Sequence, residues 1–369
     1  MKFTCTQENL TTALNAVSHI TGKTTTLPIL KNLLITAEAD GITLSTTNLE
    51  IGMTTHVRGK VEVPGSFTVQ ARLLHEYLSL LGSGNVTCAL QEADLHISSS
   101  ASKTVLKGLP AEDFPVIPKV QGGVSIVLPA KVCKTALNQV VFAVAADDAR
   151  PELNGVFMRL QGQVLTLAAT DSFRLAEVTI PLPTSKEEQS VILPSRTMQE
   201  LNRILPETDD VVIRLSESQV SFVVGDTELV SRLIEGQFPD YTQIIPESFT
   251  TSCTVETSAF AKVVRQVSLF CKAGINDVTL TYDTDGKQLH LNAANAQVGT
   301  SETDLDVQVQ GKGGSIVFNW RYLLDGVNAL QTEECLLELN DEKGPGLILP
   351  KQTGKGQATY RYLLMPIRQ

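Results

Sequence analysis

One short stretch of this chain occurs twice at a fixed distance. TALNAV at residues 12–17 returns as TALNQV at residues 135–140, which is 123 residues later. The same spacing separates Thr47-Asn48 from Thr170-Asp171, and the Phe-Pro pair at residues 114–115 precedes another at 238–239 by 124 residues. A chance match would not keep its register over such a distance, so these recurrences indicate a repeat of domain size. Three units of about 120 residues would account for all 369 residues.

A third copy is fainter but falls where the spacing requires it. FAKVVRQV at residues 260–267 has valines where the second copy has Ala136, Leu137 and Val140, and HLNAANAQ places Asn295 124 residues after Asp171. Units of this length are longer than solenoid repeats, so each can bury its own core. We therefore predict three domains, at residues 1–122, 123–248 and 249–369.

Each unit has the pattern of two helices and several strands. Leu10, Ala13, Leu14 and Val17 follow the i, i+3, i+4, i+7 spacing of one helix face. Second helices are predicted at ARLLHEYLSLL, at SRTMQELNRIL with Ser195 as N-cap, and at WRYLLDGVNAL. Alternating segments such as VTCALQEADLHISSS and VVIRLSESQVSFVV indicate strands. The expected fold class is α+β, with two helices packed on antiparallel sheet in each of three repeated domains.

Composition and cysteine spacing indicate where in the cell the protein is located. Hydrophobic residues make up 42% of the chain, yet no apolar run approaches the ~20 residues of a membrane-spanning helix, and the N-terminus lacks a signal-peptide core. We therefore expect a cytoplasmic protein with no membrane partner. The cysteines form no CxxC pair and stand in strand or helix patterns, which favours reduced core thiols over disulfides or a metal site. They are Cys5, Cys88, Cys133, Cys253, Cys271 and Cys335.

The sequence contains no signature of catalysis. The five histidines, each without a paired carboxylate or cysteine at useful spacing, are His19, His56, His75, His96 and His290. No GxxxxGK[ST], GxSxG or HExxH motif occurs. The acidic group Asp147, Asp148 and Glu152 reads as a charged loop rather than a metal site. We predict no catalytic residue, no metal and no cofactor.

Charge is distributed unevenly between the helices and the rest of the chain. The whole protein has 30 basic and 40 acidic residues, a net charge of −10. The predicted helices are instead basic, with Arg72, Lys131, Lys134, Arg196, Arg203, Lys262, Arg265 and Arg321 against Glu8, Glu76, Glu200 and Asp325. Their apolar stripes pack inward, so their charged stripes face solvent, either as an ordinary solvated face or as a surface for a polyanion. Aromatic residues at 5% are too few for a stacking platform, so any nucleic-acid contact is expected to ignore base sequence.

Several longer segments together resemble one family. LPAEDFPVIP, EGQFPDYTQIIP, ELNGVF, ATDSFRLAEVTIPL, FNWRYLLDGVNAL and the terminal YLLMPIRQ are similar, in order and from end to end, to the bacterial sliding clamp, the beta subunit of the replicative DNA polymerase. The resemblance implies a non-catalytic head-to-tail homodimer that encircles duplex DNA and tethers the polymerase for processive synthesis. It also implies binding of the polymerase, the clamp loader and repair proteins through short peptide motifs.

The resemblance assigns residues to these roles. The partner-peptide cleft would contain Leu153, Thr170, Phe173, Arg174, Leu175, Pro246, Asn319, Tyr322, Leu347, Met365, Pro366, Ile367 and Arg368. Without the resemblance, Leu153 and Leu175 fit plain core packing equally well. The dimer interface would contain Thr104, Leu106, Leu269 and Phe270, and the candidate DNA contacts are Lys23, Arg72, Arg196 and Arg203. Phe173 stands where many relatives have histidine, Gln369 ends the chain where an apolar residue is common, and Pro151-Glu152 replaces an aromatic pair of some relatives.

Domain size is consistent with a ring of two chains. A domain of about 120 residues has a diameter of roughly 35 Å, so three in a ring leave a gap of about 5 Å and six leave about 35 Å. Duplex DNA is about 20 Å across, a little over twice the depth of its major groove. Two chains can therefore encircle DNA and one cannot. A non-ring peptide-binding scaffold of DNA metabolism and a strand-rich enzyme remain alternatives.

Overall fold

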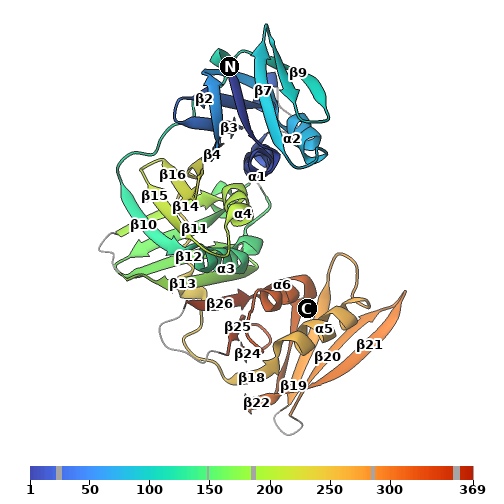
Figure 1. The fold of residues 1–369 in the computed structure, drawn as a ribbon. Helices are drawn as coiled ribbons and strands as arrows, with labels where there is room; N and C mark the ends of the chain where they lie inside the picture. The colour runs from blue at the N-terminus through green and yellow to red at the C-terminus, as the bar shows by residue number, and fades with distance from the viewer. Residues whose placement is uncertain (22–26, 148, 184–187, 284–286, 352–357, 369) are drawn as a thin grey trace. The chain divides into compact units, whose positions relative to one another are not determined.

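The computed structural model describes residues 1–21, 27–147, 149–183, 188–283, 287–351 and 358–368 (Figure 1). One pattern recurs three times along the chain, as the sequence repeat predicts: a strand, a helix, a run of strands, a second helix and three more strands. The run has five strands in the first and third repeats and four in the described part of the second. The chain forms two compact units, Met1–Lys134 with Arg196–Leu233 and Thr135–Ser195 with Ile234–Gln369. The middle repeat is thus shared between the units, because its strands pair with those of both neighbouring repeats.

The first repeat lies wholly in the first unit. Its elements are β1 (Lys2–Thr6), α1 (Gln7–Val17), β2 (Asn32–Glu38), β3 (Gly41–Thr47), β4 (Ile51–Val57), β5 (Gly59–Val63), β6 (Gly65–Gln70), α2 (Ala71–Ser79), β7 (Asn85–Gln91), β8 (Asp94–Ser98) and β9 (Lys103–Leu109). The Thr6 hydroxyl caps α1 by accepting from the Asn9 amide at 3.2 Å. The predicted stripe of α1, from Leu10 to Val17, is buried.

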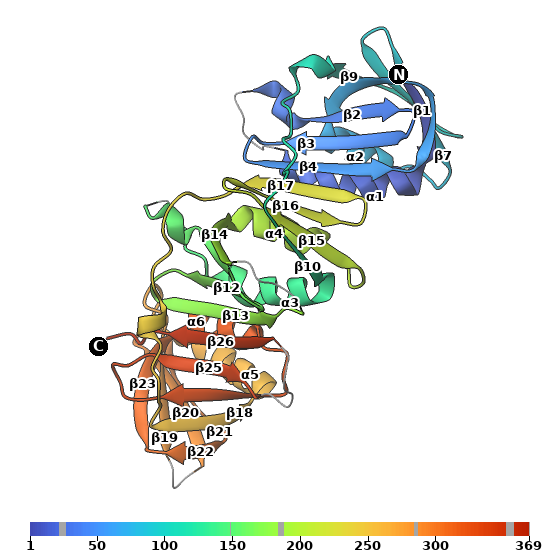
Figure 2. The same cartoon turned by 90° about the vertical axis from the view of Figure 1, so that its left-hand side faces the viewer.

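Part of the second repeat completes this unit. It supplies β10 (Val124–Pro129), α4 (Ser195–Ile204), β15 (Asp210–Leu215), β16 (Gln219–Val224) and β17 (Thr227–Arg232). β17 pairs antiparallel with β4, with Leu229 opposite Met53, so strands of two repeats form one sheet (Figure 2). α4 begins at Ser195, which was expected to be the residue just before the helix.

The second unit contains most of α3 (Ala130–Val140) and the remaining strands. From the second repeat come β11 (Gly155–Gln161), β12 (Val164–Thr170), β13 (Arg174–Pro181) and β14 (Glu188–Pro194). The third repeat supplies β18 (Thr251–Glu256), α5 (Thr257–Ser268), β19 (Asp277–Asp283), β20 (Gln288–Asn295), β21 (Gly299–Asp306), β22 (Gln308–Gly311), β23 (Gly314–Asn319), α6 (Trp320–Asn328), β24 (Glu334–Leu339), β25 (Gly346–Pro350) and β26 (Thr359–Leu364). β13 pairs antiparallel with β26, which again joins two repeats in one sheet (Figure 2).

The third repeat forms its helices for the same reasons as the first. The Glu256 carboxylate caps α5 by accepting from the amides of Ser258 and Ala259. Val263, Val264 and Val267 are buried, as the faint sequence match predicts. Asn319 caps α6, accepting from the Arg321 amide at 3.0 Å. The third repeat, whose sequence match is the faintest, therefore keeps the packing pattern of the first repeat.

The cysteines are free thiols, as predicted. Five of them are buried and Cys271 is half-buried. Burial raises the pKa of Cys253 and of Cys335 to about 11, so these thiols stay protonated near neutral pH. In the parts of the chain that the structure describes, no helix combines the length and the apolar character that a membrane crossing requires.

Candidate functional site

A tight turn between β12 and β13 organises the candidate site. The Thr170 hydroxyl donates to the Arg174 carbonyl oxygen at 2.6 Å, and one Asp171 oxygen accepts from the amides of Phe173 at 2.9 Å and Arg174 at 3.0 Å. Ser172 takes the left-handed conformation, with φ 77°. Thr and Asp favour such turns because their short side chains replace backbone partners. The turn leaves Phe173 61% exposed.

A cavity of about 550 Å³ opens beside this turn. It is lined by Ser172, Phe173, Ile275, Asn319, Tyr322, Met365, Pro366, Ile367 and Arg368. Seven of these belong to the set that the resemblance implied. Ser172 and Ile275 were not expected. Ile275 belongs to no recognisable motif, and it lies in a loop after α5 that reaches the cavity only when the chain is folded. Apolar walls with a few polar groups are typical of a site for a peptide or small ligand.

The C-terminal segment is held in place by two backbone hydrogen bonds. The Met365 amide donates to the Phe173 carbonyl oxygen at 2.9 Å, and the Ile367 amide donates to the Val317 carbonyl oxygen at 2.8 Å. A terminal segment usually frays unless it is tied down in this way. The segment therefore forms a defined wall of the cavity. Gln369 lies outside the described residues.

Three residues expected in the cleft lie in the core instead of on the cavity surface. Leu153, Leu175 and Leu347 are buried in one cluster with Phe238 and Tyr241. Met365 packs against the same cluster, so these leucines support the cavity wall from beneath. The sequence left open whether Leu153 and Leu175 were core or cleft residues, and the structure places both in the core.

Pro246 is not among the residues that line the cavity. It is half-buried, and its neighbour Ile245 packs against the cluster of leucines and aromatic rings.

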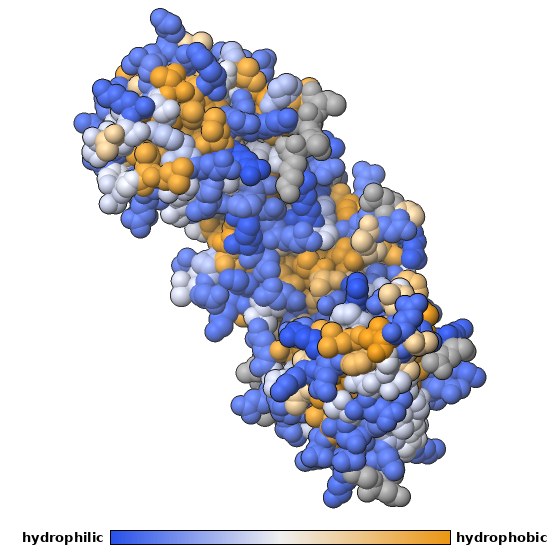
Figure 3. Space-filling view, turned by 90° about the vertical axis from the view of Figure 1, so that its right-hand side faces the viewer, coloured by the Kyte–Doolittle hydropathy of each residue, from blue (hydrophilic) through white to orange (hydrophobic). Residues whose placement is uncertain are grey.

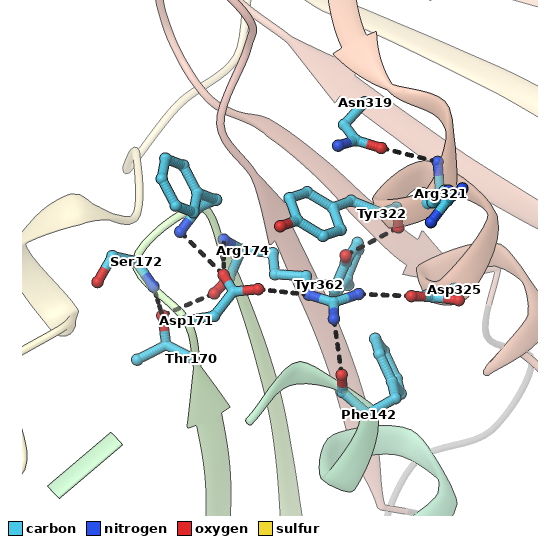
Figure 4. A network of polar contacts seen from close by, with 11 residues as sticks. Phe142, Thr170, Asp171, Ser172, Arg174, Asn319, Arg321, Tyr322, Asp325 and Tyr362 are labelled. Atoms are coloured by element: carbon cyan, nitrogen blue, oxygen red, sulfur yellow. Dashed lines mark hydrogen bonds and ion pairs between the residues drawn. The ribbon is translucent and has the colours of Figure 1, made fainter. Parts of the chain in front are cut away.

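Arg174 and its partners form a polar network that includes Tyr322, one of the residues that line the cavity (Figure 4). Its guanidinium donates to Asp171 at 3.0 Å, to Asp325 of α6 at 2.6 Å and to the Phe142 carbonyl oxygen at 2.8 Å. The same group lies over the Tyr322 ring, 4.3 Å from its centre. Burial, together with the Asp171 carboxylate, raises the pKa of the Tyr322 hydroxyl.

The candidate DNA residues differ in their surroundings. Arg196 is exposed, and Arg72 is exposed beside Glu76, with 2.7 Å between Nε and a carboxylate oxygen. Arg203 pairs with Glu200 and donates to the carbonyl oxygens of Asn15 and Ala16 at the end of α1. Its guanidinium is therefore already engaged in joining α4 to α1. Lys23 lies outside the described residues.

The expected dimer residues lie on β9 and just after the end of α5. Leu106 is 8% exposed and Thr104 is half-buried, whereas Leu269, just after α5, is 73% exposed. Phe270 is half-buried and lies near Gly299 at the start of β21. Figure 3 shows that hydrophobic side chains reach the surface in several separate places on the face it presents.

Within the described ranges, no group of three His, Cys, Asp or Glu side chains could hold a metal ion. Asp148, one member of the acidic group noted in the sequence, lies outside those ranges. The Asp147 carboxylate accepts from the Ala149 amide at 2.9 Å, a contact within its own loop. The described part of this acidic loop therefore offers no assembled cation site.

Comparison with known proteins agrees with this architecture. Family models of the DNA polymerase III beta subunit match residues 1–118 (N-terminal domain), 127–240 (central domain) and 242–368 (C-terminal domain). The beta sliding clamp of Synechocystis sp. is 32% identical, over 100% of this chain and 99% of the relative, and that of Staphylococcus aureus is 30% identical over the same shares.

Solved structures agree in fold. The DNA polymerase sliding clamp of Bacillus subtilis superposes with a TM-score of 0.94 at 27% identity, covering 100% of this chain and 99% of that one. A Pseudomonas aeruginosa sliding clamp bound to griselimycin has a TM-score of 0.94 at 26% identity, with both chains fully covered. Three matching domains in order, over the whole length, identify this chain as a member of the beta sliding clamp family, the beta subunits of bacterial DNA polymerase III.

Proposed function

We propose that this DNA sliding clamp works as a closed ring of two copies joined head to tail, with duplex DNA inside and partner peptides in the cavity beside Phe173. The ring acts without catalysis. It tethers the replicative polymerase, and the clamp loader and repair proteins use the same cavity. Family membership does not favour a non-ring scaffold.

One observation about strand edges supports ring closure. Within the chain, β4 pairs with β17 and β13 pairs with β26, each joining one repeat to the next. The strand in the same position of the third repeat is β21, which lies at the edge of its sheet. The matching strand of the first repeat is β9, which pairs with β8 along most of its length and with β6 only at Gly108 and Leu109. A second copy would complete both edges by repeating the pairing used inside the chain.

The internal pairings also predict the register between copies. Leu229 lies opposite Met53 in one pairing, and Tyr362 lies opposite Ala176 in the other. Alignment of β9 with β17 and β26 makes Thr104 equivalent to Leu229 and Tyr362. Alignment of β21 with β4 and β13 makes Ser301 equivalent to Met53 and Ala176. Thr104 faces Ile97 as Leu229 faces Phe222, and Ser301 faces Ala293 as Met53 faces Thr46. We therefore expect Thr104 of one copy opposite Ser301 of the other.

Cysteine cross-linking tests this register. Residues opposite each other in an antiparallel pair have Cα atoms about 4.5–5.5 Å apart, within the range that a disulfide spans. The T104C/S301C double variant should form disulfide-linked dimers on mild oxidation. The control T104C/L305C moves one thiol four residues along the strand, about 13 Å away, and should not. Equal cross-linking of both variants, or of neither, would contradict the proposed interface.

The same variant tests whether the ring encloses DNA. After assembly on circular duplex DNA and oxidation, the cross-linked ring should stay bound in high salt and be lost once the DNA is cut. Release from uncut circles at the same rate would show that DNA does not pass through a closed ring. Independently, L269D/F270D should give monomers, because it places charges at the end of α5 beside the proposed edge.

DNA contact is expected to be electrostatic and independent of sequence. The exposed Arg72 and Arg196 are our candidates for phosphate contacts, together with Lys23. Binding should weaken as salt rises, and replacing one residue should have a small effect because many share the contact. A strong base preference in footprinting would contradict this assignment.

The cavity is expected to bind peptides that carry a Gln followed by Leu and Phe. Burying two such apolar side chains contributes roughly 3–6 kcal/mol before ordering costs, which suits about micromolar binding and rapid exchange of partners. Griselimycin on the Pseudomonas clamp shows that a member of the family accepts a bound ligand. Deleting residues 365–369 removes one wall, so a fluorescent peptide should lose affinity while the T104C/S301C cross-link still forms. Unchanged peptide affinity would place the site elsewhere.

A further inference from the structure

We propose that Asp325 is a positioning residue of the cavity, which acts through Arg174 on Tyr322. The proposal rests on the peptide role of the cavity proposed above. Asp325 does not line the cavity, but it holds the group on which one cavity wall rests.

The position of Arg174 depends on partners from three parts of the fold. Asp171 belongs to the turn before β13, Phe142 lies just after α3, and Asp325 lies on α6. The Arg174 side chain is 10% exposed, so its N–H groups need protein acceptors. Asp171 also accepts two amides of its own turn. Asp325 is thus the acidic partner on the α6 side of the guanidinium.

Tyr322 connects this network to the cavity. It precedes Asp325 by three residues on α6, so both side chains lie on the same face of the helix. Its ring covers the Arg174 guanidinium, and Phe142 lies near the same group at 5.4 Å (Figure 4). The Tyr362 hydroxyl donates to the Tyr322 carbonyl oxygen at 2.8 Å, which restrains the backbone as well. If the guanidinium loses Asp325, it can shift toward Asp171, and the Tyr322 ring loses its support.

The test is peptide binding by D325N, measured with a fluorescent peptide that contains Gln, Leu and Phe. Replacing the charged acceptor should weaken binding about tenfold, because hydrogen bonds between charged groups are the stronger ones. D325E keeps a carboxylate and should recover most of the affinity.

The matched control is E334Q, since Glu334 is also 44% exposed, also pairs with a basic residue (Lys351, 2.8 Å), and does not line the cavity. Its affinity should stay within about twofold.

A double-mutant cycle separates positioning from general damage. If Asp325 acts through Arg174, then adding D325N to R174A should weaken peptide binding by less than about twofold. Full additivity of the two changes, equal losses in D325N and E334Q, or unchanged binding in D325N would each overturn the proposal. The T104C/S301C cross-link in each background checks that ring closure is intact. If the unmodified protein does not bind the peptide at all, the proposed peptide role of the cavity is wrong. If the unmodified protein binds the peptide and D325N binds it equally well, only the proposed role of Asp325 is wrong.

Discussion

The two junctions between repeats use the same turn for different purposes. Before β4, in the first unit, the Asn48 side-chain oxygen accepts two amides at 3.0 and 2.7 Å, and before β13, in the second unit, Asp171 does the same at 2.9 and 3.0 Å. The next residues, Leu49 and Ser172, both have φ 77°. Asn and Asp are interchangeable here because either oxygen can replace a backbone acceptor. The backbone of the repeat is therefore preserved where the sequence has changed.

The side chains that follow the turn make the difference. Ile51 is 2% exposed and lies opposite Ser231 of β17. Arg174 occupies the same place in the second junction, opposite Leu364, and draws Asp325 into its network. An apolar residue closes the first junction, whereas a buried cation supports a cavity in the second. Equivalent backbone positions thus do not imply equivalent function.

The largest expected effect comes from making the first junction resemble the second. Ile51→Arg would bury a guanidinium in a strand pairing built around an apolar side chain, and an uncompensated buried charge costs about 3–5 kcal/mol. Ile51→Val should cost about 1 kcal/mol. Urea denaturation, with hydrogen exchange at the amides of β4 and β17, measures both. A loss for Ile51→Arg no larger than that for Ile51→Val would show that this junction already accommodates a cation.

A smaller effect is expected from exchanging the turn residues. Asp171→Asn keeps an acceptor for the turn but weakens the contact with Arg174, so it should lower stability by about 1–2 kcal/mol. Among the described residues no cation is paired with Asn48, so Asn48→Asp should change stability by no more than about 0.5 kcal/mol. Both are measured by chemical denaturation. Equal losses would show that the turn itself, rather than the network with Arg174, sets the cost.

The smallest effect concerns the helix caps and appears only in acid. The Ser258 hydroxyl, followed by the amides of Ala259 and Ser258, lowers the pKa of Glu256 at the start of α5, whereas α1 is capped by the uncharged Thr6. Because the pKa of Glu256 is lower in the folded state, its carboxylate stabilises the fold at pH values above the unfolded-state pKa of about 4.3. This contribution to stability is lost as pH falls through the folded-state pKa.

Hydrogen exchange, normalised to intrinsic rates, should therefore show fraying at the start of α5 but not of α1 as pH falls below about 4. Glu256→Gln should remove this pH dependence. Parallel behaviour of the two helices would contradict the assigned role of the cap.

Local pattern predicted much of the fold. The stripe from Leu10 to Val17 and the valines of α5 were visible because helical periodicity is a property of adjacent residues. The resemblance likewise named the C-terminal segment from Met365, which the structure places on the cavity. Ile275 could not be found this way, since it lies in a loop whose position depends on the packing of α5 and β19. The sequence named Arg203 as a candidate DNA contact but could not show its hydrogen bonds to the carbonyl oxygens near the end of α1, because those acceptors are far away in sequence.

The sequence by itself determined that this chain repeats one α+β unit three times, because spacing, turn residues and apolar periodicity are written locally in each copy. Only the tertiary structure decided how the repeats share their sheets, through β4 with β17 and β13 with β26. It also decided that Arg174 meets Asp325, 151 positions later. Strand register and buried ion pairs depend on long-range packing, where one residue of slip would exchange the faces of a strand. That information lies in no single segment, so the cavity and its supporting network emerge only when the chain is folded.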